Sequence, residues 1–179
     1  MASATASARF ESSNATGVFF VHSCPPALVA QVEWALAREI DQLVKPHWSP
    51  QPLQQGLLRA TVDWCGPVGT AAAVASSLFG WQQLRFEITE DATAHSDSGR
   101  WMHTPTLGIF HLRTDAAGNG LLSEQTIRAA IAHTAARPDR LASALTRALG
   151  DAWDRELEPY RVAEEGDATI FELPRLGVG

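Results

Sequence analysis

The stretch LRATVDWCGPVGTAAAVASSLFGWQQLRFEITE, residues 58–90, decides the fold. Its first part, Leu58 to Trp64, alternates apolar and polar side chains, which is the period-two pattern of a strand with one buried face. The same alternation returns over 81–90. Between them, Thr70 to Phe79 is rich in alanine and ends at Gly80, which predicts a helix that can lie close against a sheet. The stretch therefore predicts a strand, a helix and a second strand.

The preceding residues repeat this order. An apolar run over 17–23 ends at Cys24-Pro25-Pro26 and predicts a first strand. From Pro25 onward, apolar residues at helical spacing predict an amphipathic helix, and they are Val29, Val32, Leu36 and Ile40. Residues 43–52 contain three prolines, so we expect an edge strand there. Residues 17–90 thus predict a ferredoxin-like βαββαβ core with an antiparallel sheet in strand order 4-1-3-2.

The remaining residues predict an extension of this core. A β-hairpin is expected at 100–113, followed by helices that begin at Ser123 and at Leu141 and are separated at Pro138. A last short helix from Asp151 should end before Pro159, with an acidic turn over 164–167 and a terminal strand over 168–173 after it. We expect a disordered tail at 1–16 and a single α+β domain at 17–179, in which 91–179 is an integrated extension of the core at 17–90.

The two cysteines test this topology. Cys24 and Cys65 occupy equivalent strand-to-helix junctions in the two halves of the core. The first and third strands of the expected sheet are antiparallel neighbours, so these junctions lie at opposite ends of the sheet, roughly 20 Å apart. Two sulfurs at that separation cannot bond. We therefore expect two free thiols.

The charge balance argues against several kinds of partner. The chain has 14 Lys and Arg against 20 Asp and Glu, a net charge of −6, and its basic residues are scattered. This distribution offers no footprint for a phosphate backbone. No signal peptide and no apolar span of about 18 residues is recognisable. We expect a cytoplasmic protein that binds neither nucleic acid nor membrane.

The end of the first strand is a candidate ligand site. His22 and Ser23 lie there, beside Cys24 and the helix that begins at Pro25. A helix N-terminus attracts anions and lowers the pKa of a nearby thiol, so the junction could bind an anion or carry a reactive cysteine. A structural role is the alternative, because buried cysteines behave as small hydrophobes and Pro25-Pro26 removes two amide donors.

A second helix N-terminus follows Gly66, Gly69 and Thr70. This segment lacks the lysine of a P-loop and the third glycine of the dinucleotide fingerprint, so a tight turn with a helix cap is the simpler interpretation. The histidines and nearby carboxylates match no established metal-ligand spacing, and no catalytic motif is present. We expect no catalytic residue, no metal and no cofactor.

One face of the predicted sheet is left uncovered by the predicted helices. Its polar residues are Arg59, Thr61, Arg85 and Glu87. Several tryptophans, including Trp48 and Trp81, lie near the ends of predicted elements. Because Trp and Arg are enriched in protein interfaces, we expect a binding surface that includes Trp48, Arg59, Trp81 and Arg85. The alternative is that the tryptophans fill a core whose small residues are mostly alanine.

Seven segments together resemble an actinobacterial family known as domain of unknown function 3145. They are Val21–Ser23, Val32–Leu36, Trp48–Pro52, Gly66–Thr70, Leu84–Glu90, Thr104–Gly108 and Leu157–Tyr160. The resemblance runs from about Gly17 to the end of the chain and brings no catalytic residues with it. It implies, through an association with fatty-acid synthesis genes, an accessory role in acyl-CoA carboxylation or acyl-carrier chemistry.

Two functional hypotheses follow. The first is a non-catalytic regulatory protein that binds a larger enzyme, such as an acyl-CoA carboxylase subunit or another component of malonyl-CoA and fatty-acid metabolism. The second is a sensor or enzyme for an acyl-CoA or another anion, with its site at His22, Ser23 and the helix start at Pro25. The oligomeric state stays open.

Overall fold

A computed structural model describes residues 14–40 and 45–168, with side chains up to Ala163. Across these residues runs an antiparallel seven-stranded sheet in the order β2-β3-β1-β4-β5-β6-β7. The strands are β1 (Asn14–Cys24), β2 (Ser49–Pro50), β3 (Leu58–Pro67), β4 (Arg85–Glu90), β5 (Ser98–Thr104), β6 (Gly108–Thr114) and β7 (Gly120–Leu121). The predicted hairpin, β5 and β6, extends the expected four-stranded sheet beyond β4, and the short β7 continues it.

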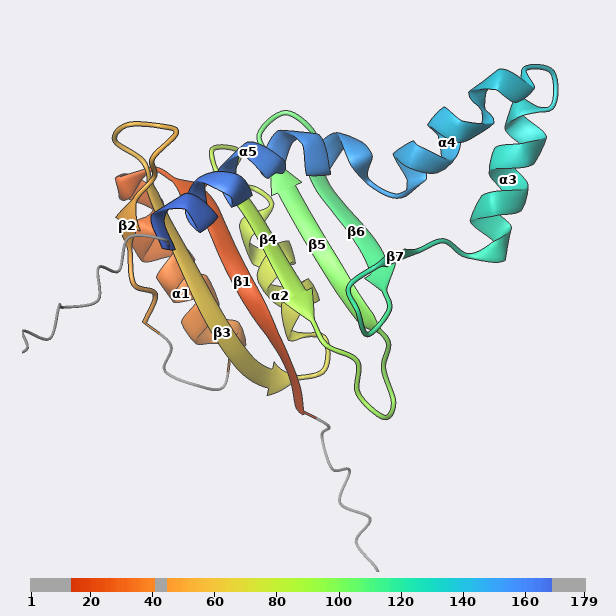
Figure 1. The fold of residues 1–179 in the computed structure, drawn as a ribbon. Helices are drawn as coiled ribbons and strands as arrows, with labels where there is room; N and C mark the ends of the chain where they lie inside the picture. The colour runs from red at the N-terminus through yellow and green to blue at the C-terminus, as the bar shows by residue number, and fades with distance from the viewer. Residues whose placement is uncertain (1–13, 41–44, 169–179) are drawn as a thin grey trace, which may run out of the picture.

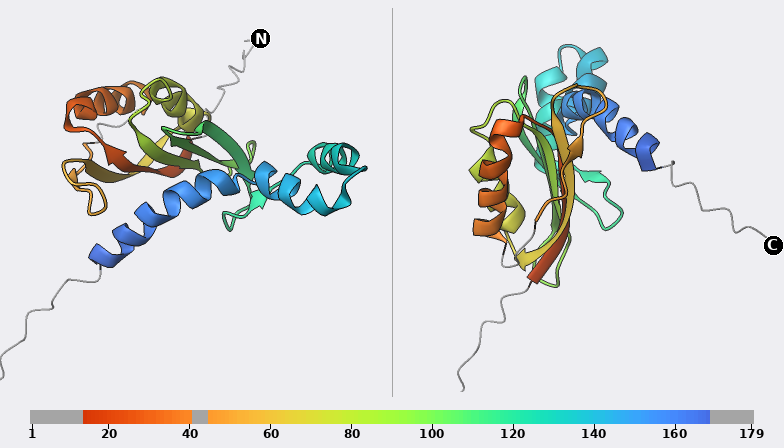
Figure 2. Two further views of the ribbon diagram at one scale, coloured as in Figure 1. Left: turned by 90° about the horizontal axis from the view of Figure 1, so that it is seen from above. Right: turned by 90° about the vertical axis from the view of Figure 1, so that its left-hand side faces the viewer.

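The helices are arranged in two layers and an arm (Figure 1). Those described are α1 (Val29–Glu39), α2 (Thr70–Leu78), α3 (Glu124–Thr134), α4 (Leu141–Ala148) and α5 (Asp151–Ala168), with 3₁₀ turns at Pro26–Leu28 and Pro138–Arg140. α1 and α2 cover one face of the sheet, and α5 crosses the opposite face (Figure 2).

The main core lies between the sheet and the layer formed by α1 and α2. The alternating residues of the strands supply one side of it, and the apolar stripe of each helix supplies the other. Phe19 and Phe86 meet at its centre with their ring centroids 5.8 Å apart. Fully buried members include Phe19, Val32, Leu36, Val74, Leu78, Phe86 and Ile88.

The register confirms the expected neighbours of β1. Phe19 pairs with Val62 of β3 and with Ile88 of β4. Cys24 pairs with Leu58 while Cys65 pairs with Thr16, so the cysteines lie at opposite ends of the two strands. Seven residues of strand separate them, about 24 Å. Both thiols are free, as expected.

Several expected boundaries are wrong. β1 begins at Asn14, so residues 14–16 belong to the sheet, while the rest of the expected tail lies outside the described residues. β4 begins at Arg85 because two turns precede it, in which Trp81 N–H donates to Leu78 O and Leu84 N–H donates to Trp81 O. β2 has only two residues, consistent with prolines on either side of His47 and Ser49 that cannot donate to a ladder.

α3 and α4 form an arm, residues 123–149, that projects beyond the β7 edge of the sheet (Figures 1 and 2). The Ser123 hydroxyl accepts a hydrogen bond from Thr126 N–H and caps α3, as expected. The predicted break at Pro138 is also present, because a 3₁₀ turn begins there. Ala130 is the one buried residue of α3, and α4 has none.

α5 is longer than expected. It continues through Pro159 to Ala168, so the predicted stop and the predicted turn at 164–167 are wrong. The remainder of the predicted strand, 169–173, lies outside the described residues. Proline removes one helical hydrogen bond, but Leu157 and Tyr160 bury their side chains here and hold the helix on the sheet. No helix in the described ranges has the length and apolar content that a membrane crossing requires.

Candidate functional site

A cluster of charged side chains lies between α5 and the sheet. Nε2 of His22, on β1, lies 2.8 Å from Oε1 of Glu87, on β4. Nε of Arg161, on α5, donates to the same oxygen at 2.7 Å. An ionised carboxylate can only accept, so Nε2 of His22 carries the proton in this arrangement. One buried carboxylate therefore connects two strands and a helix.

A second carboxylate on α5 completes the cluster. Nη2 of Arg100, on β5, donates to Oδ1 and Oδ2 of Asp154 at 3.1 and 3.2 Å. Nη2 of Arg161 donates to Oδ1 of Asp154 at 3.0 Å. Two arginines thus face two carboxylates, and their ion pairs attach α5 to β4 and β5, while His22 links β1 to the same cluster.

The electrostatics make this cluster structural. Burial by itself raises the pKa of Glu87, but hydrogen bonds from His22 and Arg161 outweigh it and lower the pKa to about 2. Burial by itself lowers the pKa of Arg161, but its hydrogen bond to Glu87 outweighs it and raises the pKa above the usual range. Neither group can exchange a proton near neutral pH, as general acid–base catalysis requires.

The expectation that the second face of the sheet is open is wrong around Arg85 and Glu87. Glu87 is buried beneath α5. The guanidinium carbon of Arg85 lies 5.2 Å from the ring centroid of Tyr160, and its Nε lies 3.7 Å from Oε1 of Glu156. Arg59 is half-buried, and its Nε donates to Oγ of Ser49 at 3.3 Å. Thr61 remains exposed.

The expected ligand site at the end of β1 is enclosed. His22 and Ser23 are 1% and 0% exposed. The Ser23 hydroxyl donates to Oε1 of Gln54 at 3.1 Å, and Nε2 of Gln51 donates to the carbonyl of His22 at 2.5 Å. Burial raises the pKa of the Cys24 thiol to about 12, so this cysteine is not an activated nucleophile. A ligand would have to displace protein groups to reach the junction.

The N-terminus of α2 already holds an anionic group. Gly69 N–H donates to Oε1 of Glu90 at 2.8 Å, and Ala71 N–H donates to Oε2 at 3.0 Å. Gly69 has φ +94°, and a Cβ on Gly66 would lie 2.9 Å from Oγ1 of Thr70. Gly66, Gly69 and Thr70 therefore shape a turn capped by a carboxylate. Glu90 was missed because its sequence position resembles that of any polar residue ending a strand.

Three large side chains are exposed on the helical layer. Trp34 is 61%, Phe79 is 55% and Trp81 is 38% exposed. The guanidinium carbon of Arg38 lies 4.6 Å from the ring centroid of Trp34, and its Nη2 donates to Oγ of Ser77 at 2.6 Å, two residues before Phe79. We call Trp34, Arg38, Phe79 and Trp81 the aromatic patch.

Sequence reasoning found only part of this patch. Trp81 was expected at a surface and is exposed, whereas Trp34 and Phe79 were missed. Trp34 could have been found, because it lies off the helical stripe of Val32 and Leu36. Trp48 is half-buried against the core, and its Nε1 donates to Oε1 of Glu33 at 3.0 Å, so its role is structural.

Comparison with known proteins gives a family. The family model DUF3145, described as a protein of unknown function, matches residues 18–173, which is most of the chain. The chain belongs to the DUF3145 family. No curated protein and no solved structure matches it.

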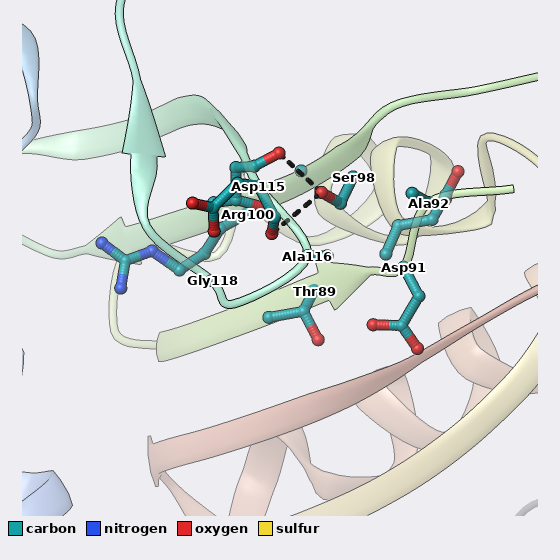
Figure 3. A pocket seen from close by; sticks show the side chains of 11 residues that line it. Thr89, Asp91, Ala92, Ser98, Arg100, Asp115, Ala116 and Gly118 are labelled. Carbon is teal, nitrogen blue, oxygen red and sulfur yellow. Dashed lines mark hydrogen bonds between the residues drawn. The ribbon is translucent and has the colours of Figure 1, made fainter.

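The DUF3145 protein has a pocket of about 330 Å³ beside the ends of β4, β5 and β6 (Figure 3). The carboxylates that line it have partners within the protein. Asp91 accepts a hydrogen bond from the Thr16 hydroxyl at 2.6 Å, and Asp115 accepts from the backbone N–H groups of Ala117 and Asn119. The Ser98 hydroxyl donates to the carbonyl of Thr114 at 2.6 Å. Apart from Nε of Arg100, which has no hydrogen-bond partner among the described residues, these polar groups are engaged within the protein, so the pocket offers a ligand few free polar groups.

His103 on β5 and His111 on β6 make different contacts and do not converge on one point. Nδ1 of His103 lies 2.9 Å from the carbonyl of Leu84, while His111 stacks on Trp101 with ring centroids 4.3 Å apart. Within the residues that the structure describes, no group of three or more potential ligands could hold a metal ion.

Proposed function

We propose that this DUF3145 protein is a non-catalytic accessory protein that binds and modulates a larger enzyme through the aromatic patch. The observation that carries the proposal is the exposure of Trp34, Phe79 and Trp81 on the helical layer. Arg38 lies over Trp34, and Ser77 and Glu39 hold it in place. Trp and Arg dominate the binding energy of protein interfaces, and large exposed apolar side chains that gather on one surface mark contact sites.

The energy of burying the patch favours a protein partner. The three side chains are 38–61% exposed, so burying what remains exposed contributes roughly 1–2 kcal/mol each, a part of a micromolar affinity of about 8 kcal/mol. Arg38 is already oriented by Trp34 and Ser77, which reduces the entropy lost when it orders at an interface. None of the patch residues lines either of the two pockets described, and small ligands need a concave site, so the patch suits a protein better.

The enclosed polar residues support a non-catalytic role. His22, Glu87 and Arg161 are engaged with one another, and Glu87 stays ionised at neutral pH. The alternative function, a sensor or enzyme for an acyl-CoA or another anion at His22 and Ser23, would require α5 or the loop around Gln54 to move away first. No observation favours that opening over a permanent structural contact.

The enzyme that we propose as partner is an acyl-CoA carboxylase subunit or another component of malonyl-CoA and fatty-acid metabolism. The support for this choice is the association with fatty-acid synthesis genes that the sequence resemblance implies. The aromatic patch supports a protein partner but does not indicate which protein it is. Such a partner would place the DUF3145 protein in the cytoplasm.

We also infer that residues 14–90 have a ferredoxin-like arrangement within the larger sheet. The order β4-β1-β3-β2, with α1 and α2 on one face, supports this inference. The two-residue β2 and the three strands beyond β4 are departures from the four-stranded unit.

Affinity capture from native lysate, followed by quantitative mass spectrometry, tests the proposed function. The chain is compared with a patch variant, Trp34→Ala with Phe79→Ser, and with Leu53→Ser, which alters an exposed apolar residue elsewhere. We expect an enzyme subunit to be enriched by the unaltered chain and by Leu53→Ser, and at least ten-fold less by the patch variant. Recovery of no enzyme above background, or equal recovery by all three, would contradict the proposal.

A thermal-shift screen with CoA esters tests the alternative. If an ester stabilises the unaltered chain and Leu121→Ser, an exposed residue of β7, but not His22→Ala, the site at the end of β1 is favoured over the partner surface. Indifference to every ester agrees with the accessory role.

A further inference from the structure

The arm formed by α3 and α4 has an apolar surface that the rest of the described chain leaves uncovered. Ile127 and Ile131, one helical turn apart on α3, are both exposed, and Ile131 is 52% exposed. Leu149, at the end of α4, is exposed as well, while Leu141 and Leu145 are half-buried. Two short helices that pack mainly on each other cannot bury the whole apolar face of each. Their exposed apolar residues therefore form a surface that another protein surface could cover.

The arm also differs in charge from the rest of the molecule. Residues 123–150 contain four arginines and two acids, a net charge of +2, whereas the whole chain carries −6. The remainder therefore carries −8, of which residues 14–40, 45–122 and 151–163, with twelve acids against eight basic residues, contribute −4. Arg128 pairs with Glu124, but Arg137, Arg140 and Arg147 have no carboxylate partner in the part of the chain that the structure describes. A basic apolar arm thus extends from an acidic body.

We propose that the arm docks on the acidic body of a second copy of this chain, and that the second copy's arm docks reciprocally, in a two-fold dimer. Charge complementarity selects this contact over a pairing of arm with arm, because two arms of +2 repel each other while an arm and a body attract. The arm shares no residue with the aromatic patch, so this proposal rests on other residues than the proposed function does.

The size of the arm supports a reciprocal contact. α3 and α4 are each about 15 Å long and about 10 Å wide, so together they present one face of about 300 Å². A single contact, counting both surfaces, would then bury about 600 Å², which is below the range of stable interfaces. Two equivalent contacts bury about 1,200 Å² and reach it, as a two-fold axis provides without any further surface.

Sedimentation velocity of the full chain between roughly 1 and 50 µM tests this dimer, because stable interfaces of this size give dissociation constants in or below that range. The variants are Arg140→Glu with Arg147→Glu, which reverses the arm's charge to −2, and Ile127→Asp with Ile131→Asp, which disrupts its apolar face. Leu53→Asp is the control, and circular dichroism verifies folding of each. We expect a dimer that weakens with added salt, at least ten-fold weaker association in both arm variants, and an unchanged control.

Each other outcome would overturn the proposal. A monomer throughout the concentration range removes the second copy, and recruitment of that monomer to anionic vesicles would assign the arm to a membrane surface instead. A dimer that survives charge reversal rules out the contact of arm with acidic body. Two arms repel each other equally at +2 and at −2, so such a dimer would pair arm with arm. If the isoleucine variant does not fold, the charge reversal decides alone.

Discussion

Glu87 shows how a residue's role can depend on distant sequence. Its place in the alternation of β4 was correct, because it points away from the core of Phe86 and Ile88. Its burial could not be deduced locally, because the residue that covers it, Arg161, is 74 positions away. Tyr160 and Glu156, the partners of Arg85 on α5, are more than 70 positions from it and could not be predicted locally either. A polar face identified by alternation is therefore exposed only if no later element covers it.

Acid titration of stability tests the contribution of Glu87. Its pKa of about 2 in the folded protein lies below the ordinary value of 4.5. The folded state thus favours the carboxylate, and the resulting stabilisation, about 3 kcal/mol, is complete above about pH 5 and is lost as the pH falls toward 2. We expect Glu87→Gln to lower the free energy of unfolding by about 3 kcal/mol at pH 7, because Arg161 loses its buried partner.

The comparison needs chemical denaturation across the acid range for three proteins. Glu87→Gln should flatten the loss of stability between pH 5 and 2, while the exposed Glu124→Gln, a matched control, should keep the slope of the unaltered chain. An unchanged slope in Glu87→Gln would show that the carboxylate does not titrate as described.

Gly17 is constrained by a close approach in the sheet. A Cβ built on it would lie 1.9 Å from the carbonyl oxygen of Thr89 and 2.8 Å from Cζ2 of Trp64. We expect Gly17→Ala to lower the free energy of unfolding by at least about 2 kcal/mol, because backbone and core must shift together. A Cβ on Gly80 would meet nothing within 4 Å. Gly80→Ala should therefore change stability by less than about 1 kcal/mol in urea unfolding, and equal effects of the two substitutions would contradict the packing.

Among the elements, the spacing of apolar residues and the positions of glycine and proline predicted the strands and helices of the first half of the chain well. The alternation of β3 and the stripe of α1 are strong signals, and both elements form where expected. Proline was less reliable. It limited β2 to two residues but did not end α5, because the side chains on both sides of Pro159 are held against the sheet. Tertiary packing overrides a local preference of a few kcal/mol.

Replacing Pro159 tests whether α5 is a continuous helix. Alanine restores the N–H that Pro159 lacks, and Pro159 is exposed, so the change creates no cavity. The unfolded chain gains conformational entropy when alanine replaces proline, which offsets part of the gain in helix stability. We therefore expect Pro159→Ala to raise the free energy of unfolding by about 1–2 kcal/mol. Val162→Ala, exposed on the same helix, should stay within about 0.5 kcal/mol. A loss of stability in Pro159→Ala would indicate that the helix ends at this residue.

At the scale of the whole molecule, the sequence indicated the α+β class and the neighbours of β1 but not the third layer. α5 covers the part of the second face around Arg85 and Glu87, so Arg85 and His22 lie in internal contacts, while Thr61 stays exposed. Trp81 is the candidate that remains at the surface, joined by Trp34 and Phe79. The exposed surface could not be predicted because it depends on which faces the later elements cover.

The central claim is that the protein acts through its aromatic patch and not through its buried polar residues. Site-specific photo-crosslinking in cells that naturally make the protein tests this most directly, with a benzophenone amino acid placed at Trp34, at Phe79 or at Leu53. We expect one adduct, containing the same enzyme subunit, from positions 34 and 79 and none from position 53. Absence of that adduct at both patch positions, or equal yield at Leu53, would contradict it.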